Sequence, residues 1–246
     1  MSLEWLYSLD ELKAYSLATR QGKERLETLL KHLPGMLEAV GLRLPNEPRV
    51  LSLMVGSCIE GIAFAHHYKA QVTCLDVQKR LLTIGAKEAR RRKLNLRTVV
   101  GDIKQLTKHV TGRFDLVTIL GSPLPHLGIF AFDEVVSRVR RVLAKNGTFL
   151  VEQADLVFRI LPNYRDAFVA NLKPPVITVH HSFNPKQGYF ERLYYSKTKN
   201  RLFRVYLWSP WIIEYVLKKN GFSKVEVIPY VSPYTAIQSY LFTART

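Results

Sequence analysis

Between residues 49 and 151 the chain alternates short apolar runs with segments whose apolar residues recur at helical spacing. The helical segments cover residues 59–68 and 78–93, and a third has Val135, Val139 and Leu143 on one face. The apolar runs are short and bounded by turn residues, so we expect buried strands at 49–54, 72–76, 96–100, 114–120 and 148–151. Strands that alternate with helices of this length predict a parallel sheet with right-handed crossovers.

The segments on either side of this region differ from it. One or two helices are predicted over about residues 9–33, where four leucines fall on one stripe, and Pro34-Gly35 is expected to end them. A helix is predicted over 155–171, and the period-2 alternation of 176–208 predicts a small antiparallel sheet. The last predicted elements are a helix opened by Ser209-Pro210 and strands over 224–228 and 236–243.

Together these elements predict an α/β fold. It is a Rossmann-like, mostly parallel seven-stranded sheet flanked by helices, with a small antiparallel β insertion near the C-terminal end. No internal repeat and no Gly/Ser linker divides the 246 residues, so we expect a single domain over residues 1–246.

Composition excludes several classes of protein. Hydrophobic residues make up 47% of the chain, yet no stretch approaches the roughly 20 apolar residues of a membrane span, so no membrane partner is expected. The first residues do not have the pattern of a signal peptide. With Cys58 and Cys74 as its only cysteines, the chain has neither a disulfide framework nor a cysteine zinc site, and we expect no metal. A cytoplasmic, reduced location fits best.

The formal net charge of +16 favours polyanionic partners such as RNA. The densest basic cluster is Arg90-Arg91-Arg92-Lys93, at the end of a predicted helix. There it also complements the helix dipole, with no ligand needed. Because the remaining charge is spread along the chain, the charge alone does not decide between a nucleic-acid partner and an ordinary basic surface.

Polar and turn residues follow four of the predicted strands. The turn Gly56-Ser57-Cys58 follows the first strand, and Asp76-Val77 ends the second about 20 residues later, where an acid that binds ribose is expected. Asp102-Ile103 follows the third strand, and Leu120-Gly121 ends the fourth. Because parallel strands bring their carboxyl ends to one edge of the sheet, these residues predict a site for a ligand with a ribose and an adenine.

Five segments in this order resemble the class I SAM-dependent methyltransferases, which use S-adenosyl-methionine (SAM). The resemblance covers about residues 49–155 and rests on Val50–Cys58, Cys74–Val77, Val100–Ile103, Phe114–Val117 and Val139–Thr148. It implies SAM as the cofactor, with Asp76 on its ribose and Asp102 on its adenine amino group. It also implies that the backbone around Gly56 approaches the methionine part of SAM.

The glycine turn departs from the pattern of this family. The family has an acid in the first strand and three glycines in the turn, whereas this chain has Ser52 at the acid position and Met54 and Cys58 at two glycine positions. Only Gly56 remains. A side chain at position 54 crowds SAM unless it packs sideways. A non-catalytic SAM-binding protein is therefore an alternative to an enzyme.

The residues after the fourth strand bear on the acceptor of the methyl group. Residues 120–126 lack the Asn/Asp-Pro-Pro-aromatic motif of enzymes that methylate exocyclic base amines, and neither cysteine is placed to serve as a nucleophile. Transfer to an O, N or S atom remains, by alignment of the nucleophile with the methyl group. His126, just beyond the strand, is the candidate general base.

The aromatic residues of 176–208 favour a small-molecule acceptor, because they are suited to wall a pocket. We therefore expect this insert to act as a cap, and residues 1–35, with Tyr7 and Tyr15, to act as a helical lid over SAM. The alternative is an RNA-directed methyltransferase, which the net charge and the Arg90–Lys93 cluster favour.

Overall fold

The computed structural model describes residues 13–233 and 238–245 of the chain. Its main sheet has seven strands in the order β10-β11-β5-β4-β1-β2-β3. The five central strands are parallel, while β11 pairs antiparallel with both β5 and β10. These are the seven predicted strands: β1 (Arg49–Leu53), β2 (Gln71–Asp76), β3 (Leu96–Val100), β4 (Phe114–Ile119), β5 (Leu143–Ala154), β10 (Lys224–Val231) and β11 (Gln238–Arg245).

Helices cover both faces of this sheet, which explains why its central strands are apolar almost throughout. One buried cluster joins the sheet to α1 (Arg20–Ala39), α2 (Ile59–Tyr68) and α3 (Lys79–Arg91). The other joins it to α4 (Leu106–His109), α5 (Ile129–Val142) and α7 (Pro210–Lys219). Short 3-10 helices η2 (Lys13–Tyr15), η3 (Ile103–Gln105) and η4 (Leu124–His126) complete the connections. None of the described helices has the length and apolar character that crossing a membrane requires.

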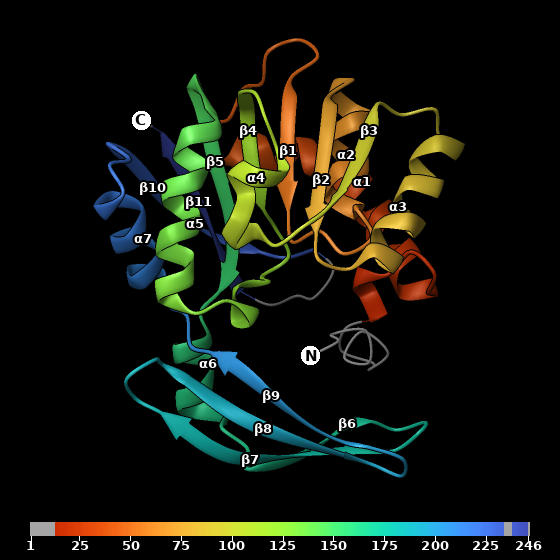
Figure 1. Cartoon of the computed structure of the whole chain (residues 1–246), viewed down its shortest axis with the longest axis vertical. Coiled ribbons are helices and arrows are strands. Elements are labelled where there is room, and N and C mark those ends of the chain that lie inside the picture. The colour runs from red at the N-terminus through yellow and green to blue at the C-terminus, as the bar shows by residue number, and fades with distance from the viewer. Residues whose placement is uncertain (1–12, 234–237, 246) are drawn as a thin grey trace.

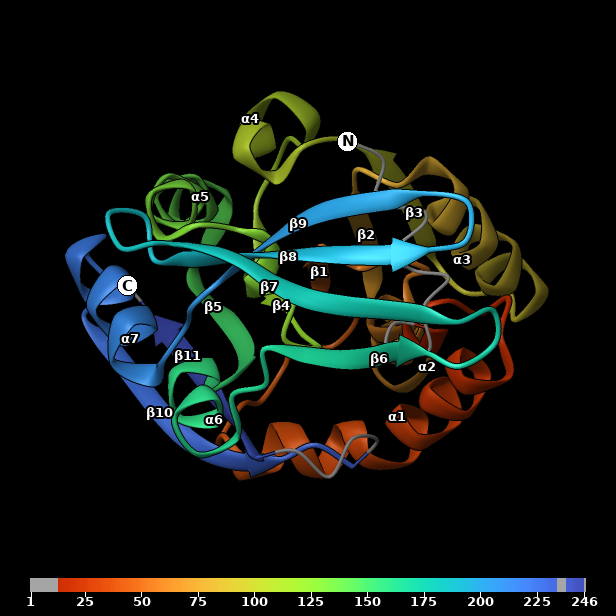
Figure 2. The ribbon, with the colours of Figure 1, turned by 90° about the horizontal axis from the view of Figure 1, so that it is seen from below.

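The antiparallel insert is a second sheet, in the order β6-β7-β8-β9. It lies across the carboxyl ends of the parallel strands, which point toward it in Figure 1 and are seen behind it in Figure 2. The predicted range 176–208 contains three of its strands, β7 (Val176–Asn184), β8 (Tyr189–Ser196) and β9 (Asn200–Tyr206).

The helix expected over 155–171 is wrong in its second half. Helix α6 covers only Leu156–Asn163, and Ala167–Asn171 forms the fourth strand of the insert, β6. Strand β6 pairs antiparallel with β7. This pairing between strands outweighs the local helical pattern, which carries no information about the partner strand.

The N-terminal helix also differs from its prediction. Thr19 caps α1 by accepting a hydrogen bond from the backbone N–H of Gly22, so the helix begins at Arg20, and it continues through Pro34-Gly35 to Ala39. Proline has no N–H, so Pro34 leaves the carbonyl of Leu30 without its helical donor. The imidazole of His67, on α2, hydrogen-bonds with this carbonyl instead. A tertiary contact thus satisfies the group that the proline frees.

We expect Pro34→Ala to raise the free energy of unfolding by about 1–3 kcal/mol, because alanine restores the helical N–H. His67→Ala should then destabilise the natural chain more than the Pro34→Ala chain, where the Leu30 carbonyl has a backbone donor. Urea denaturation of the two single variants and the double variant measures this coupling. An equal cost of His67→Ala in both backgrounds would show that His67 does not compensate for the proline.

Candidate active site

The turn between β1 and α2 has three residues in the left-handed backbone region. The φ angle is 55° at Met54, 50° at Gly56 and 61° at Cys58. This conformation costs a residue with a Cβ atom roughly 1–2 kcal/mol, and glycine adopts it freely. Met54 and Cys58 therefore keep the conformation that glycine favours, although both carry side chains. Cys58 is fully buried, whereas Met54 is half-buried and packs against the core.

Asp76 connects the loops that follow β1 and β2. One carboxylate oxygen accepts the backbone N–H of Gly56 at 2.9 Å, and the other accepts the N–H of Gln78 at 2.9 Å. Burial raises the pKa of Asp76, while hydrogen bonds from the backbone of Gly56, Gln78 and Val77 oppose this rise by stabilising the carboxylate. The side chain fixes the spacing of two loops and leaves lone pairs on both oxygens for a ligand.

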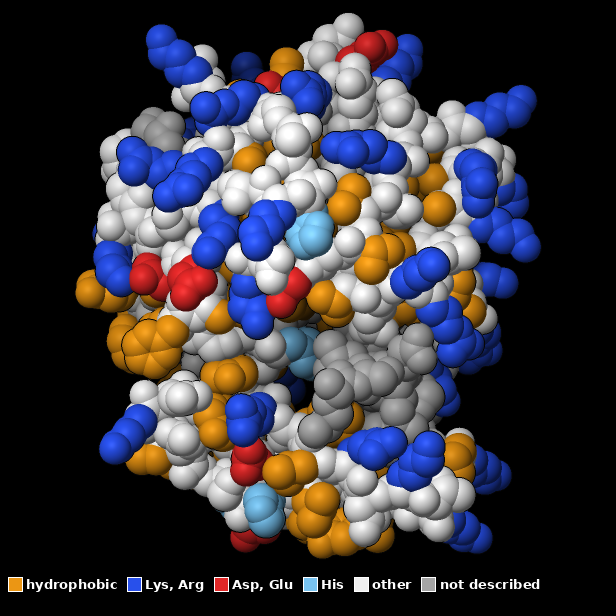
Figure 3. Space-filling model, in the orientation of Figure 1, with side chains coloured by type: hydrophobic (Ala, Val, Ile, Leu, Met, Phe, Trp, Pro, Cys, Tyr) orange, Lys and Arg blue, Asp and Glu red, His pale blue; other side chains and the backbone are white. Residues whose placement is uncertain are grey.

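A cavity of about 270 Å³ lies at the carboxyl edge of the sheet. Its wall brings together residues that are far apart in the sequence, including these predicted site residues: Asp76, Val77, Asp102, Ile103 and His126. Val77 is half-exposed and Ile103 is buried, so the wall has apolar surface beside its two carboxylates. Figure 3 shows the hollow between the main sheet and the insert.

Two further polar residues of this wall were not predicted. Gln78 and Lys104 line the cavity with the residues named above. Each lies two residues beyond a predicted acid, so the position after each strand was a usable signal. Tyr206, one of the aromatic residues of 176–208 that were expected to wall a pocket, also lines the cavity from β9, and its ring lies against Gly128.

The Gln78 side chain stands out within this wall. Its Oε1 atom is buried and has no hydrogen-bond partner among the described residues, and the residue is 7% exposed. A buried acceptor without a donor costs about 1–3 kcal/mol. A ligand with an N–H or O–H group in the cavity would satisfy this atom.

Asp102 is engaged by its own loop. Its carboxylate accepts the backbone N–H of Lys104 at 2.9 Å and lies 3.3 Å from the Lys104 ammonium group. Both side chains are partly exposed, so this ion pair is weak and open to exchange with a ligand.

The other predicted cofactor residues do not line the cavity. Ser57 Oγ donates to the Tyr15 carbonyl at 2.9 Å and accepts the N–H of Leu17 at 2.9 Å. Gly121 accepts the Tyr15 hydroxyl at 2.8 Å and donates to buried Glu152 at 2.8 Å. Leu120 and Cys58 are buried in the core. Tyr15 therefore spans the ends of β1 and β4, while residues 1–12 of the expected lid, with Tyr7, lie outside the described residues.

His126 lies in the cavity wall at the end of η4. Burial lowers its pKa below the ordinary value of 6.5, because the surroundings disfavour the charged imidazolium. The imidazole is therefore neutral near pH 7 and is able to accept a proton. His180, in contrast, bonds to Tyr164 within the insert and is not part of this wall.

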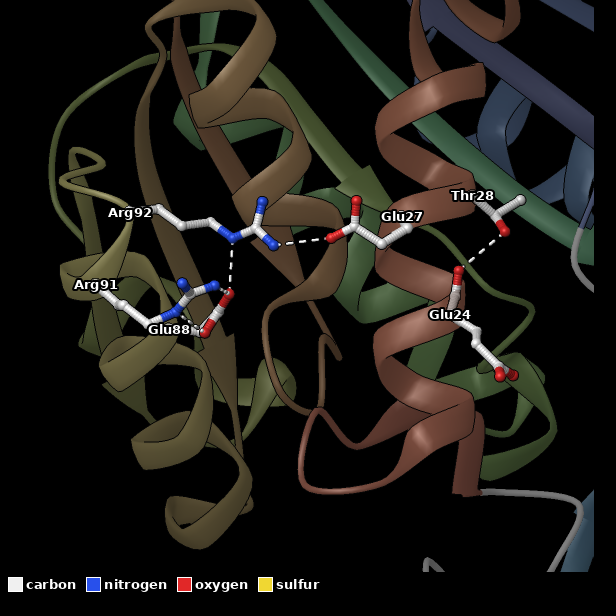
Figure 4. Close-up of polar contacts among 6 residues, drawn as sticks. All are labelled: Glu24, Glu27, Thr28, Glu88, Arg91 and Arg92. Atoms are coloured by element: carbon white, nitrogen blue, oxygen red, sulfur yellow. Dashed lines mark hydrogen bonds and ion pairs between the residues drawn. The ribbon is translucent and has the colours of Figure 1, made fainter.

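Two cations of the Arg90–Lys93 cluster, Arg91 and Arg92, are paired with carboxylates. Glu88 pairs with Arg91 at 2.6 Å and with Arg92 at 2.7 Å, and Glu27 of α1 pairs with Arg92 at 2.9 Å (Figure 4). These contacts lower the pKa of Glu88 to about 2. The strongest basic motif of the sequence thus ties α3 to α1. Among the described residues, no group of His, Cys, Asp or Glu is arranged to bind a metal.

Known proteins resemble the chain in sequence and in fold. A family model described as a methyltransferase domain matches residues 50–147, and no curated protein matches. The PH0226 protein of Pyrococcus horikoshii is 20% identical, with a TM-score of 0.70 over 98% of each chain. SAM-bound CalS10, an amino pentose methyltransferase from Micromonospora echinaspora, is 16% identical, with a TM-score of 0.57 over 91% of each chain.

A third solved structure holds both a product and an acceptor. The 1,6-didemethyltoxoflavin-N1-methyltransferase of Burkholderia thailandensis is bound to its acceptor and to S-adenosyl-homocysteine. It is 18% identical, with a TM-score of 0.56 over 98% of this chain and 87% of that chain.

We expect the left-handed backbone at Met54 to distinguish two isomeric substitutions. Leucine and isoleucine have equal volume, but a β-branched residue is a clear outlier at positive φ. Met54→Ile should therefore lower the free energy of unfolding by about 1 kcal/mol more than Met54→Leu does. Thermal or urea unfolding measures the difference, and equal stability of the two variants would contradict the strained turn.

The lowered pKa of His126 has a consequence for stability. In the unfolded chain this histidine gains its proton near pH 6.5, whereas in the folded chain it resists protonation. The unfolded state thus binds more protons below pH 6.5, so this contribution to stability is full above that pH and is lost as the pH falls. We expect His126→Gln to lose less stability than the natural chain between pH 7.5 and 5.5, while His32→Gln, exposed on α1, should behave like the natural chain. Equal losses for both variants would mean that His126 titrates normally.

Proposed function

We propose that the chain is a class I SAM-dependent methyltransferase and that it transfers the methyl group of SAM to an O, N or S atom of a small-molecule acceptor. The observation that carries the proposal is the cavity at the carboxyl edge, which joins Asp76, Gln78 and Asp102 beside apolar surface. SAM supplies a methyl group already activated by its sulfonium charge, so the protein mainly has to align the reactants.

The residues of the cavity fit the nucleoside part of SAM. In the proposed site Asp76 accepts the ribose hydroxyl groups, and the unpartnered Gln78 Oε1 accepts a further O–H or N–H. Asp102 exchanges its exposed contact with Lys104 for the adenine amino group. Val77 and Ile103 supply apolar surface for the adenine ring.

The methionine part would lie near the backbone of Gly56, Ser57 and Cys58 and the end of β4 at Leu120-Gly121. Tyr15 crosses this region, with its carbonyl bonded to Ser57 and its hydroxyl to Gly121. We propose that Tyr15 belongs to the lid over the cofactor. The glycine-like backbone of Met54 and Cys58 supports an intact cofactor turn over a non-catalytic SAM binder.

His126 and the insert form the proposed acceptor side. A neutral imidazole in the cavity wall is suited to remove a proton from the acceptor atom as the methyl group arrives. The insert lies over this edge of the sheet and contributes Tyr206 to the wall, which supports its role as a cap. The amino pentose and toxoflavin methyltransferases that share the fold support a small molecule as the acceptor. RNA is less favoured, because Arg91 and Arg92 of the Arg90–Lys93 cluster are paired with carboxylates of the protein.

We expect Gln78→Met to weaken SAM binding about 3- to 10-fold, the scale of one lost hydrogen bond. Its free energy of unfolding without ligand should be unchanged or higher, because the substitution removes a buried acceptor that has no partner. Asp76→Ala should weaken SAM binding more, but it also breaks the bonds that hold two loops. The Gln78→Met substitution therefore tests the contact with the ligand without breaking the hydrogen bonds that hold the two loops.

Isothermal titration with SAM and with S-adenosyl-homocysteine measures these affinities. Gln71→Met is the matched control, because Gln71 is exposed at the opposite end of β2. Unchanged affinity of the Gln78→Met protein for both ligands would show that the nucleoside does not bind in this cavity.

A further inference from the structure

A second hollow lies at the opposite edge of the main sheet. It has a volume of about 490 Å³, and its lining contains Arg113, Arg140 and Lys145 over Leu143 and Ala144. Arg113 precedes β4 and Lys145 lies near the start of β5, so this hollow is at the amino ends of the parallel strands. The length of β4 puts it roughly 20 Å from the cofactor cavity. Figure 3 shows Lys and Arg side chains gathered over this upper part of the molecule.

One of the three cations is held in place by backbone. The Arg113 guanidinium donates to the carbonyl of Arg141 and, at 3.2 Å, to that of Leu143, at the C-terminus of α5. The Arg140 guanidinium lies near Gly221, just beyond α7, where an added Cβ would meet its Nη1 at 2.7 Å. An anion that binds here meets an Arg113 guanidinium that is already oriented, so less side-chain entropy is lost on binding.

Among the described residues, these cations lack the carboxylate partners that neighbouring cations have. Arg138 of α5 pairs with Glu134, and Lys219 of α7 pairs with Asp133. Within residues 13–233 and 238–245, no carboxylate lies within ion-pair distance of Arg113, Arg140 or Lys145. The dipole of α5 favours Arg113, which donates to its last carbonyls, and Arg140, which lies in its last turn. It does not explain why Lys145, beyond the helix, faces the same concavity.

We propose that this hollow binds an oxyanion of the phosphate class, at a site separate from the methyl-transfer cavity. Guanidinium groups bind phosphate through paired N–H donors, and Lys145 adds a mobile ammonium group. A concave surface lined by one sign of charge concentrates the field, so it attracts anions more strongly than the same charges spread over a convex surface. The phosphate groups come either from a small polyphosphate or from the backbone of RNA, which share this chemistry.

The test compares two double variants of equal charge. Arg140→Gln/Lys145→Gln removes two cations of the hollow and leaves Arg113 at the end of α5. Lys87→Gln/Arg90→Gln removes two exposed cations of α3 that form no ion pair among the described residues. All four side chains are exposed, so both proteins should fold as the natural chain does.

Isothermal titration with inorganic tripolyphosphate and with a single-stranded oligouridylate, each at two salt concentrations, gives the affinities. We expect at least one probe to bind the natural chain, at least 10-fold weaker binding to Arg140→Gln/Lys145→Gln, and less than a 2-fold change for the α3 variant. Tripolyphosphate binding identifies a small polyphosphate as the source, whereas binding of the oligouridylate alone identifies RNA. Equal losses in both variants, or no saturable binding of either probe at millimolar concentration, would overturn the proposal.

Discussion

The hydrogen bonds of the Asp76 carboxylate tie together two loops at the carboxyl edge of the sheet, and the candidate site depends on them. They join the backbone of Gly56, after β1, to that of Gln78, after β2. Each loop carries a strained or unsatisfied group, namely Met54 at positive φ and Gln78 with a buried acceptor. The carboxylate keeps both groups at one cavity. The energy stored in such a site is typical of positions shaped for a ligand.

The sequence predicted the elements that depend on local pattern and failed where a distant partner decides. Strand β3 at 96–100 and helix α2 at 59–68 lie where their periodicity puts them, because burial on the sheet follows that periodicity. Strand β6 was missed because its stability comes from β7. Helix α1 continues past Pro34, where the imidazole of His67 hydrogen-bonds with the Leu30 carbonyl that the proline leaves without a helical donor. Strand β5, expected over 148–151, already begins at Leu143, and its register with β4 shifts between Leu143 and Thr148.

The same division applies to the site. Asp76 and Asp102 were predictable, since parallel topology brings the residues that follow strands to one edge. The aromatic residues of 176–208 were expected to wall a pocket, but which of them reaches this cavity depends on how the insert lies over that edge, and Tyr206 does so. The sequence also does not show which cations are paired. Arg91 and Arg92 are paired with carboxylates, whereas Arg140 and Lys145 have no carboxylate partner among the described residues. The density of basic residues along the sequence therefore does not locate the unpaired cations.

Amide hydrogen exchange with and without S-adenosyl-homocysteine tests the central claim, that the nucleoside binds at the edge held by Asp76. We expect slower exchange at the loops that contain Gly56 and Gln78 and at residues 101–104, because the ligand covers them. Exchange around Arg113 and Lys145, at the other edge, should not change. No protection of these three loops at saturating ligand, or protection confined to the other edge, would show that the nucleoside does not bind at the edge held by Asp76.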